Sequence, residues 1–330
     1  MERTLFLNRW YALRPSRLVN PTKPLGVKLL GHDLVLWRNQ ENQIVVNNNV
    51  CPHRGAKLSM GKVTPNKKCI ECPYHGWQFD DSGNLVNVPS MQECSLENKL
   101  SIDTYTTMES GGLIWFCPGS PASGYNPPVI REMHDKTWTY VTGYDVFDND
   151  WLTTLENSID ITHVNFVHSD FGDRQNGAVK EIDIKTKAVD HLRMYSTINH
   201  KSDSALLKFS ENPEVRVKHT ILLPNTVCIQ FWVKDILNVI TYVTYTPISD
   251  NKTIINWVFL RHPKIPLFDS ILDYFFNQGM TKAIIEDKHI VNSLDSTSLD
   301  TRLSVQPDII QEKFRAQLKK MKMYEPTTEH

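Results

Sequence analysis

The chain has 330 residues, of which 40% are hydrophobic and 22% are charged, and its formal net charge is −1. This length and apolar content are sufficient for about two domains with ordinary hydrophobic cores. Because positive and negative charges nearly balance, nucleic acid and anionic membrane surfaces are not expected partners.

Signals for membrane insertion or export are not evident in the sequence. No apolar run reaches the roughly 18 residues needed to span a bilayer. The first segment, MERTLFLNRWYAL, lacks a long apolar stretch followed by small residues, so no secretory signal is expected. The 6 cysteines do not indicate a disulfide scaffold in a chain of this length. These features together favour a cytoplasmic protein.

Residues 1–118 are predicted to form a small all-β domain. Short apolar runs typical of strands alternate with turn residues, at Val27–Leu30, Asp33–Trp37, Gln43–Asn47 and Gly112–Cys117. The tetrapeptide Asp81-Ser82-Gly83-Asn84 predicts a tight hairpin turn between two further strands. A segment rich in Pro, Gly and Ser, residues 118–124, follows the last strand. We therefore place the domain boundary there and assign residues 119–330 to a second domain.

Two short segments of the first domain each combine one cysteine with one histidine. They are Cys51-Pro52-His53 and Cys72-Pro73-Tyr74-His75. Two thiolates and two imidazoles are the ligands of a Rieske [2Fe–2S] cluster, in which the cysteines hold one iron and the histidines the other. This ligand set raises the reduction potential above that of an all-cysteine cluster, so the segments predict a protein that handles single electrons.

A structural zinc site is the main alternative, because Cys₂His₂ zinc sites also combine two close ligand pairs. The glycines that follow the pairs, Gly55 and Gly76, favour iron, since they let main-chain N–H groups turn toward bridging sulfides. Trp77 is expected to cover the cluster and exclude water. Cys69 is the one competitor for the place of Cys72, but its neighbours lack the same loop chemistry. The remaining cysteines, Cys69, Cys94, Cys117 and Cys228, are expected to be free thiols.

The full pattern CPHRGAKLSMG…CPYHGWQFDDSG resembles the Rieske domain of the Rieske non-heme iron oxygenases. Rieske proteins of the cytochrome bc type carry an additional disulfide at two positions that are Ala56 and Tyr74 here, so the respiratory type is disfavoured. The resemblance implies a helix-grip, or START-like, catalytic domain after the Rieske domain, and hence an α+β protein.

The second domain is predicted to combine helices with an antiparallel meander. A helix is expected over Trp151–His163, and alternating patterns predict strands at Thr226–Val233, Val239–Thr246 and Thr253–Leu260. A long helix should follow from about Phe268 to Leu294. We expect a last charged helix, about Ile309–Met321, to be a solvated surface element.

A second metal site is predicted from residues that recur at helical spacing. Asn157, Asp160 and His163 share one face of the first helix, and His168 follows past the expected helix end. Two histidines and one carboxylate form the facial triad of non-heme Fe(II) oxygenases, which leaves positions open for dioxygen. The best candidate for the carboxylate is Asp287.

Asp287 lies in an apolar stripe of the long helix, where an unpaired carboxylate is costly unless it binds a metal. Its neighbour Glu286 falls on a more polar side and is expected to be solvated. The late aspartate also sits where the demethylase-like members of the resembled family carry their third iron ligand.

The family motif matches Asn157, Asp160, His163 and His168 residue for residue. The resemblance implies that Asp160 bridges an iron-ligand histidine of its own subunit and a cluster histidine of a neighbouring subunit. That neighbour's residue corresponds to His53 or His75, in a head-to-tail homotrimer. A metal-bound imidazole commonly donates its second N–H to a carboxylate, which is consistent with this role. Asn157 is expected close to the iron.

These sites together predict an oxygenase. Electrons would come from a separate reductase or ferredoxin, because no G-x-G-x-x-G fingerprint opens a helix in this chain. The cluster would pass them to a mononuclear Fe(II), which activates O₂ as co-substrate beside an aromatic or polycyclic small molecule. The chain most resembles the vanillate and dicamba demethylase group and related tailoring monooxygenases, so the expected outcome is hydroxylation or oxidative demethylation.

Two other functions are compatible with parts of the sequence. A Rieske-type electron-transfer protein without oxygenase activity would need only the cluster, and a ligand-binding protein with a structural zinc would need no iron. The substrate pocket is assigned to one of two sheet faces, the first carrying Trp232, Tyr242 and Trp257, the second Phe231, Val243 and Asn256. The candidate substrate-binding residues are Trp232, Tyr242 and Asn256.

Overall fold

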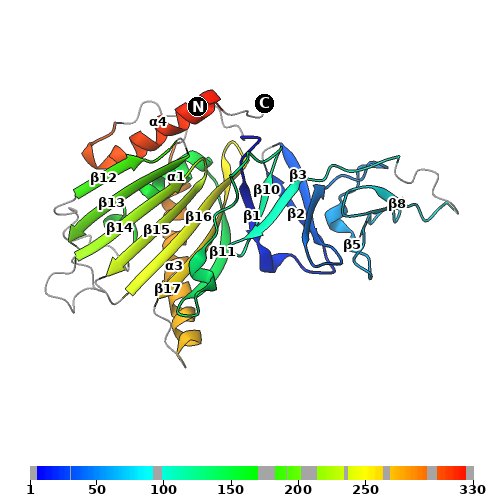
Figure 1. The fold of residues 1–330 in the computed structure, drawn as a ribbon, viewed down its shortest axis with the longest axis horizontal. Coiled ribbons are helices and arrows are strands. Elements are labelled where there is room, and N and C mark those ends of the chain that lie inside the picture. The colour runs from blue at the N-terminus through cyan, green and yellow to red at the C-terminus, as the bar shows by residue number, and fades with distance from the viewer. Residues whose placement is uncertain are drawn as a thin grey trace. The chain divides into compact units, whose positions relative to one another are not determined.

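Figure 1 shows the computed structural model of the chain, in which residues 6–29, 31–91, 99–169, 183–190, 192–201, 214–233, 237–262, 268–295 and 303–324 are described. The chain divides into two compact units between Val129 and Ile130. This division lies later than the predicted boundary after residue 118, because the Pro/Gly/Ser-rich segment is held by the first unit. Gly119 N donates to Leu7 O at 2.7 Å, and Trp10 Nε1 donates to Tyr125 O at 2.7 Å.

The described part of the first unit consists of small antiparallel sheets, as predicted. The strands are β1 (Tyr11–Pro15), β9 (Thr106–Ser110) and β10 (Leu113–Cys117) in one sheet, β2 (Leu25–Leu29), β3 (His32–Arg38) and β4 (Ile44–Asn48) in a second, and β5 (Lys62–Val63), β6 (Ile70–Glu71), β7 (Gln78–Phe79) and β8 (Leu85–Asn87) in a third. Short 3-10 turns occur at η1 (Ser16–Leu18) and η2 (Leu58–Met60). Trp37, Phe79 and Leu85 are fully buried in a core that also contains the side chains of Cys51 and Cys72.

The second unit is built on a seven-stranded antiparallel sheet with the order β11-β17-β16-β15-β14-β13-β12. Its strands are β11 (Thr139–Phe147), β12 (Asp183–Ala188), β13 (Arg193–Lys201), β14 (Glu214–Leu222), β15 (Thr226–Val233), β16 (Leu237–Ser249) and β17 (Lys252–His262). Its helices are α1 (Trp151–Ile159), α2 (Val164–Val167), α3 (Asp269–Val291) and α4 (Ile309–Tyr324), with 3-10 turns η3 (Arg131–His134) and η6 (Gln306–Asp308). The predicted meander of β15, β16 and β17 is confirmed by their antiparallel pairing.

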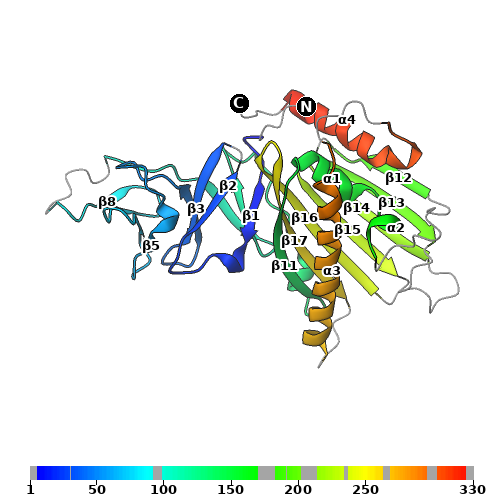
Figure 2. The ribbon, with the colours of Figure 1, turned by 180° about the vertical axis from the view of Figure 1, so that it is seen from behind.

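Helices α1, α2 and α3 lie on one face of the sheet, which we call the helix-covered face (Figure 2). Tyr245 of β16 contacts Ser158 of α1 through its hydroxyl group, and the Phe259 ring of β17 packs at 6.4 Å from that of Phe276 of α3. Side chains alternate between the two faces along a strand, so every second residue from these positions belongs to the same face. Among the helices described here, none is both long and apolar enough to cross a membrane.

The predicted first helix is shorter than expected. Asp150 caps its start by accepting hydrogen bonds from Leu152 N at 3.0 Å and Thr153 N at 3.1 Å. The helix ends at Ile159, because Asp160 leaves the helical conformation and its Oδ1 accepts from Thr162 N and Thr162 Oγ1, both at 2.7 Å. An aspartate that bonds the main chain two residues on forms a turn that competes with the helix. The prediction of one continuous helix to His163 was therefore wrong.

The expectation that the last helix is a solvated surface element was also wrong. One side of α4 is buried in the second unit, with side chains at most 1% exposed at Ile310, Phe314, Leu318 and Met321. These residues recur every three or four positions and form one apolar stripe. The charged residues that suggested solvation occupy the other side of the helix, apart from Arg315, which pairs with the buried Glu156 of α1.

Candidate metal centres

The two Cys–His segments of the first unit fold into the same hydrogen-bonded turn. In the loop Cys51–Ala56, the first N–H donates to the last C=O at 2.9 Å, and Gly55 N donates to Cys51 O at 2.9 Å. In the loop Cys72–Trp77 the corresponding distances are 2.8 and 3.1 Å, with Gly76 as the donor to Cys72 O. The glycines have φ values of +73° and +71°, a left-handed conformation that other residues adopt at a cost. Each glycine thus closes a turn that presents one cysteine and one histidine.

The four predicted cluster ligands lie close together in this unit. The Cys51 and Cys72 side chains are buried, and burial together with the neighbouring Cys72 thiol raises the pKa of Cys51 to about 11. The imidazoles are nearer the solvent, and the ring centroids of His53 and His75 are 4.5 Å apart. Nδ1 of His53 is buried and has no hydrogen-bond partner among the residues that the structure describes. Two adjacent buried thiols and an unpartnered imidazole nitrogen fit a cluster that replaces the thiol protons and binds the nitrogen.

The structure describes Trp77 and three of the four cysteines that are not predicted ligands. The Trp77 ring is 8% exposed and stacks on the His53 ring at 4.4 Å with an interplanar angle of 2°. Cys69, Cys117 and Cys228 are free thiols, and no disulfide joins the cysteines in the described ranges. Cys94 lies outside the described residues.

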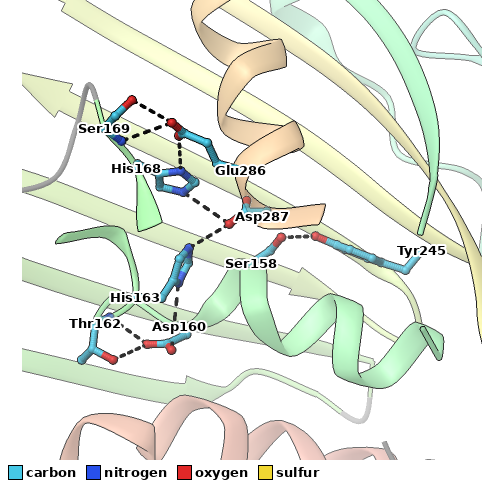
Figure 3. A network of polar contacts seen from close by, with 9 residues as sticks. All are labelled: Ser158, Asp160, Thr162, His163, His168, Ser169, Tyr245, Glu286 and Asp287. Atoms are coloured by element: carbon cyan, nitrogen blue, oxygen red, sulfur yellow. Dashed lines mark hydrogen bonds and ion pairs between the residues drawn. The ribbon is translucent and has the colours of Figure 1, made fainter. Parts of the chain in front are cut away.

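The second centre is formed by three side chains from separate segments of the second unit (Figure 3). His163 lies between α1 and α2, His168 directly follows α2, and Asp287 is on α3. Oδ1 of Asp287 is 3.3 Å from Nε2 of His163 and 3.4 Å from Nε2 of His168. One ligand atom from each residue lies within 4.8 Å of the others. The structure therefore brings together the three residues predicted as the iron triad.

This cluster of donors fits a divalent metal ion. The side chains of His163, His168 and Asp287 are 14%, 9% and 14% exposed. Both ring nitrogens of His163 and Oδ1 of Asp287 are buried and make no hydrogen bond within the described residues. Burial alone would lower the pKa of His163, but the Asp287 and Asp160 carboxylates raise it above its ordinary value. Buried polar atoms are normally satisfied, and two imidazoles with one carboxylate are the donor set of a facial triad.

Glu286 contradicts the expectation that it is solvated. Its Oε2 lies 3.2 Å from Nδ1 of His168, and its Oε1 accepts from Ser169 Oγ at 2.7 Å (Figure 3). Burial would raise the pKa of Glu286, but the contacts with Ser169 and His168 hold it below its ordinary value. Sequence reasoning missed this role because His168 and Glu286 are far apart in the chain. The one available signal for a role of Glu286 was its place next to Asp287, because consecutive side chains point to different sides of a helix and can contact different groups.

Asp160 and Asn157 lie beside the triad on the segment that carries His163. Oδ2 of Asp160 is 4.0 Å from Nδ1 of His163, while its Oδ1 is held by Thr162. Asn157 is half-buried near the end of α1, and its main-chain oxygen accepts from Asp160 N at 3.3 Å. The carboxylates next to the His163 ring are thus Asp287 at Nε2 and Asp160 near Nδ1.

The structure corrects how the predicted pocket residues are divided between the two faces of the sheet. The strand register pairs Tyr242 with Val258, and Val243 with Trp257, so Tyr242 and Trp257 belong to opposite faces of the sheet. By the same alternation, the candidates Trp232, Tyr242 and Asn256 lie on the face away from α1 and α3. The helix-covered face, which is the face of the triad, instead carries Phe231, Val243 and Trp257. A shift of one residue in register exchanges the two faces, and the sequence alone did not determine it.

Comparison with known protein families divides the chain in the same way. The profile of the Rieske [2Fe-2S] domain matches residues 9–106, and that of the vanillate O-demethylase oxygenase C-terminal domain matches residues 147–323. The first match contains all four predicted cluster ligands. The second contains the triad and spans more than half of the chain.

Individual proteins show the same similarity. The oxygenase component of dicamba O-demethylase from Stenotrophomonas maltophilia is 32% identical over 169 residues, which are 50% of this chain and 48% of that protein. Cholesterol 7-desaturase nvd from Xenopus laevis is 32% identical over 171 residues, which are 50% of this chain and 37% of that protein. The aligned region is therefore less than half of either relative. The crystal structure of dicamba monooxygenase bound to dicamba superposes with a TM-score of 0.85 over 97% of this chain and 98% of that chain, and at 20% identity it supports the fold.

Proposed function

The chain belongs to the Rieske oxygenases with a C-terminal domain of the vanillate O-demethylase type, and on this premise we propose that it hydroxylates or oxidatively demethylates an organic small molecule with O₂. The observation that carries the proposal is the convergence of His163, His168 and Asp287 in the second unit. An electron-transfer protein would need the cluster ligands of the first unit but would not need this triad.

In the proposed enzyme, Cys51, Cys72, His53 and His75 hold the Rieske cluster. The buried thiols and the more exposed imidazoles support this assignment, because the cysteine iron would be enclosed and the histidine iron would face the solvent. The stack of Trp77 on His53 holds one ligand ring in place.

His163, His168 and Asp287 would hold a mononuclear iron, which supplies oxygen activation when bound. The protein groups hold this triad in position before any metal enters. Glu286 accepts from Nδ1 of His168 in the tautomer that leaves Nε2 unprotonated for binding, and Ser169 holds the Glu286 carboxylate. The low exposure of the three donors limits access of water to the site.

Asp160 is proposed to connect the two kinds of centre. Its carboxylate is near Nδ1 of His163, and the family resemblance supports a second contact with a cluster histidine of a neighbouring subunit in a homotrimer. Asn157 is proposed to lie close to the iron, because it occupies the preceding turn of the same segment. The arrangement would let one carboxylate hold imidazoles of both centres at once.

The partners follow from the division of labour between the centres. We assign electron delivery to a separate reductase or ferredoxin, since the sequence carries no dinucleotide-binding fingerprint of its own. A demethylase relative such as dicamba O-demethylase supports an aromatic substrate, and a cholesterol desaturase relative supports a polycyclic one. A cytoplasmic location is supported by the free thiols.

The proposal is tested by comparing the wild-type protein with Asp287→Ala after anaerobic iron loading. Wild type should bind about three irons per chain, give a Rieske-type EPR signal on reduction, and consume O₂ with a suitable substrate and reductant. The variant should keep the EPR signal, lose about one iron and lose turnover. A variant that retains turnover would show that Asp287 is not the third ligand. A fully metallated wild type without the EPR signal would overturn the proposed function.

A further inference from the structure

A row of polar side chains crosses the helix-covered face of the sheet. Ser196 of β13 pairs with His219 of β14, His219 pairs with Ile229 of β15, and Ile229 pairs with Thr241 of β16. Paired residues point to the same face, and Thr241 pairs in turn with Phe259, which packs on α3. Neighbouring strands are about 4.8 Å apart, so Ser196 and His219 are adjacent and Thr241 lies roughly 10 Å from His219.

The polar atoms of this row are buried and unpartnered. Ser196, His219 and Thr241 are 0%, 2% and 4% exposed, and Ser196 Oγ, His219 Nδ1 and Thr241 Oγ1 make no hydrogen bond within the described residues. Buried polar groups in folded proteins nearly always have a partner. Three such groups in one row, on a single face, indicate that the partner is a bound molecule.

The row faces the proposed metal centre. Burial, and to a smaller extent the charge of His163, lower the pKa of His219 to about 4, so this imidazole is neutral near pH 7. His219 belongs to the helix-covered face, so a molecule that hydrogen-bonds to it would lie on the same side of the sheet as the triad. A neutral imidazole and two hydroxyl groups can each donate or accept a hydrogen bond.

Within the described strands of this face, the surroundings of the row are apolar and offer no free cation. Its neighbours on the same face include Ile198, Val217, Ile221, Val227, Val243 and Trp257, all of which are buried. On the described parts of β13 to β17, the one charged side chain of this face is Arg261, which is paired with Asp269 and Asp273. Asp160, Glu286 and Asp287 add negative charge near His163, but the divalent ion that the triad would hold offsets most of it. A buried carboxylate ligand would thus lose its hydration without gaining an ion pair from a side chain of this face.

We propose that Ser196, His219 and Thr241 form the substrate-recognition strip of this protein, and that the strip selects an uncharged, mainly apolar molecule bearing a carbonyl or hydroxyl oxygen. The inference rests on the proposed function, because it assigns the ligand of that same site. The oxygen hydrogen-bonds to the strip, and the apolar body packs on the adjacent aliphatic side chains and Trp257. The strip explains why polar residues occupy buried positions where aliphatic ones would pack without cost.

The test uses three probes with one skeleton: para-methoxyacetophenone, para-methoxytoluene and para-methoxybenzoate. Binding to the full-length protein is measured anaerobically by calorimetry, so no turnover is required. We expect the ketone to bind about three- to tenfold more tightly than the toluene, as one added hydrogen bond implies. The benzoate should bind about tenfold or more weakly than the ketone, because its charge must be desolvated. Equal or tighter binding of the benzoate, or no binding of any probe at millimolar concentration, would overturn the proposal.

Variants of the strip complete the test. His219→Phe should abolish the advantage of the ketone over the toluene, and the nearly isosteric Thr241→Val should reduce it. Thr220→Val, which changes the opposite face of β14, is the matched control and should leave the ratio unchanged. If both strip variants still prefer the ketone to the toluene by the wild-type ratio of affinities, the assignment is rejected. Iron content measured on the same samples separates the two proposals, since a missing mononuclear iron refutes the oxygenase while the probe ratio tests only the strip.

Discussion

Glu286 and Asp287, consecutive residues of α3, hold opposite nitrogens of the same imidazole. Oε2 of Glu286 is 3.2 Å from Nδ1 of His168, and Oδ1 of Asp287 is 3.4 Å from Nε2. The ring is therefore fixed from both sides by one turn of one helix.

Glu286→Gln is expected to weaken metal binding without removing a ligand. The amide loses the charge that favours the Nδ1–H tautomer, so the affinity for Co(II), used as a probe of the triad, should fall by about tenfold. Calorimetric titration of the anaerobic protein measures the change. Glu312→Gln, which neutralises an exposed glutamate on α4, is the control and should bind Co(II) like wild type. Unchanged affinity in Glu286→Gln would mean that Glu286 does not position His168.

Asp160→Asn should separate metal binding from electron delivery. The asparagine can keep the turn with Thr162, whose N–H and hydroxyl donate to Oδ1, but it removes the negative charge beside His163. Both metals should load normally, while reoxidation of the reduced cluster in the presence of substrate and O₂ should slow by about tenfold or more. Stopped-flow absorbance of the cluster reports this rate. If reoxidation proceeds at the wild-type rate, Asp160 has no bridging role.

Arg315→Leu should destabilise the second unit through a buried ion pair. Nη2 of Arg315 donates to Oε2 of Glu156 at 2.5 Å, and the Glu156 side chain is only 8% exposed. Removing the arginine leaves a buried carboxylate without its partner, so the free energy of unfolding should fall by about 3 kcal/mol. The double variant Glu156→Leu/Arg315→Leu removes the unpaired charge and should recover most of the loss. Denaturant unfolding measures the free energy of unfolding of the single and the double variant. If both are destabilised equally, this explanation is rejected.

Acid should release the contacts that hold the first ligand loop. Asp33 accepts from Asn49 Nδ2 at 2.8 Å and pairs with Lys57, so it joins the residues before and after Cys51–Ala56. Burial would raise the pKa of Asp33, but these partners hold it below the ordinary value of 3.8. A carboxyl group with a lowered pKa in the folded state stabilises the protein fully above its unfolded pKa, and the contribution is lost as pH falls through the folded value.

The corresponding measurement is thermal unfolding of Asp33→Asn and wild type as a function of pH. At pH 7 the variant should be less stable by about 1 kcal/mol, and the difference should shrink as the pH falls below about 4. Glu41→Gln, an exposed acid in the same unit, should show no such trend. A difference that stays constant into acid would show that the Asp33 charge does not hold the loop.

Much of the site could be predicted because short sequence patterns identify its residues. The two Cys–His loops are short, and their glycines mark the turns that the structure contains at Gly55 and Gly76. His163 and His168 are close in sequence, and Asp287 was recognisable as a carboxylate in an apolar stripe. Strands β15, β16 and β17 matched their alternating patterns within a few residues at each end.

The features that the sequence did not predict depend on contacts between distant segments. The face on which Tyr242 and Trp257 lie is set by the register of β16 with β17, and a pattern within one strand carries no information about register. Glu286 was assigned to solvent because its partner, His168, follows another helix. The early end of α1 was missed because the side chain of Asp160 satisfies main-chain donors that a longer helix would use.

Mössbauer spectroscopy of the anaerobically iron-loaded protein tests the central claim most directly, because it distinguishes every iron environment in one sample. We predict a Rieske-type pair of irons together with one high-spin ferrous ion, and the loss of the ferrous component alone in Asp287→Ala. A spectrum in which the cluster is the only iron species, or in which Asp287→Ala retains the ferrous component, would contradict the account.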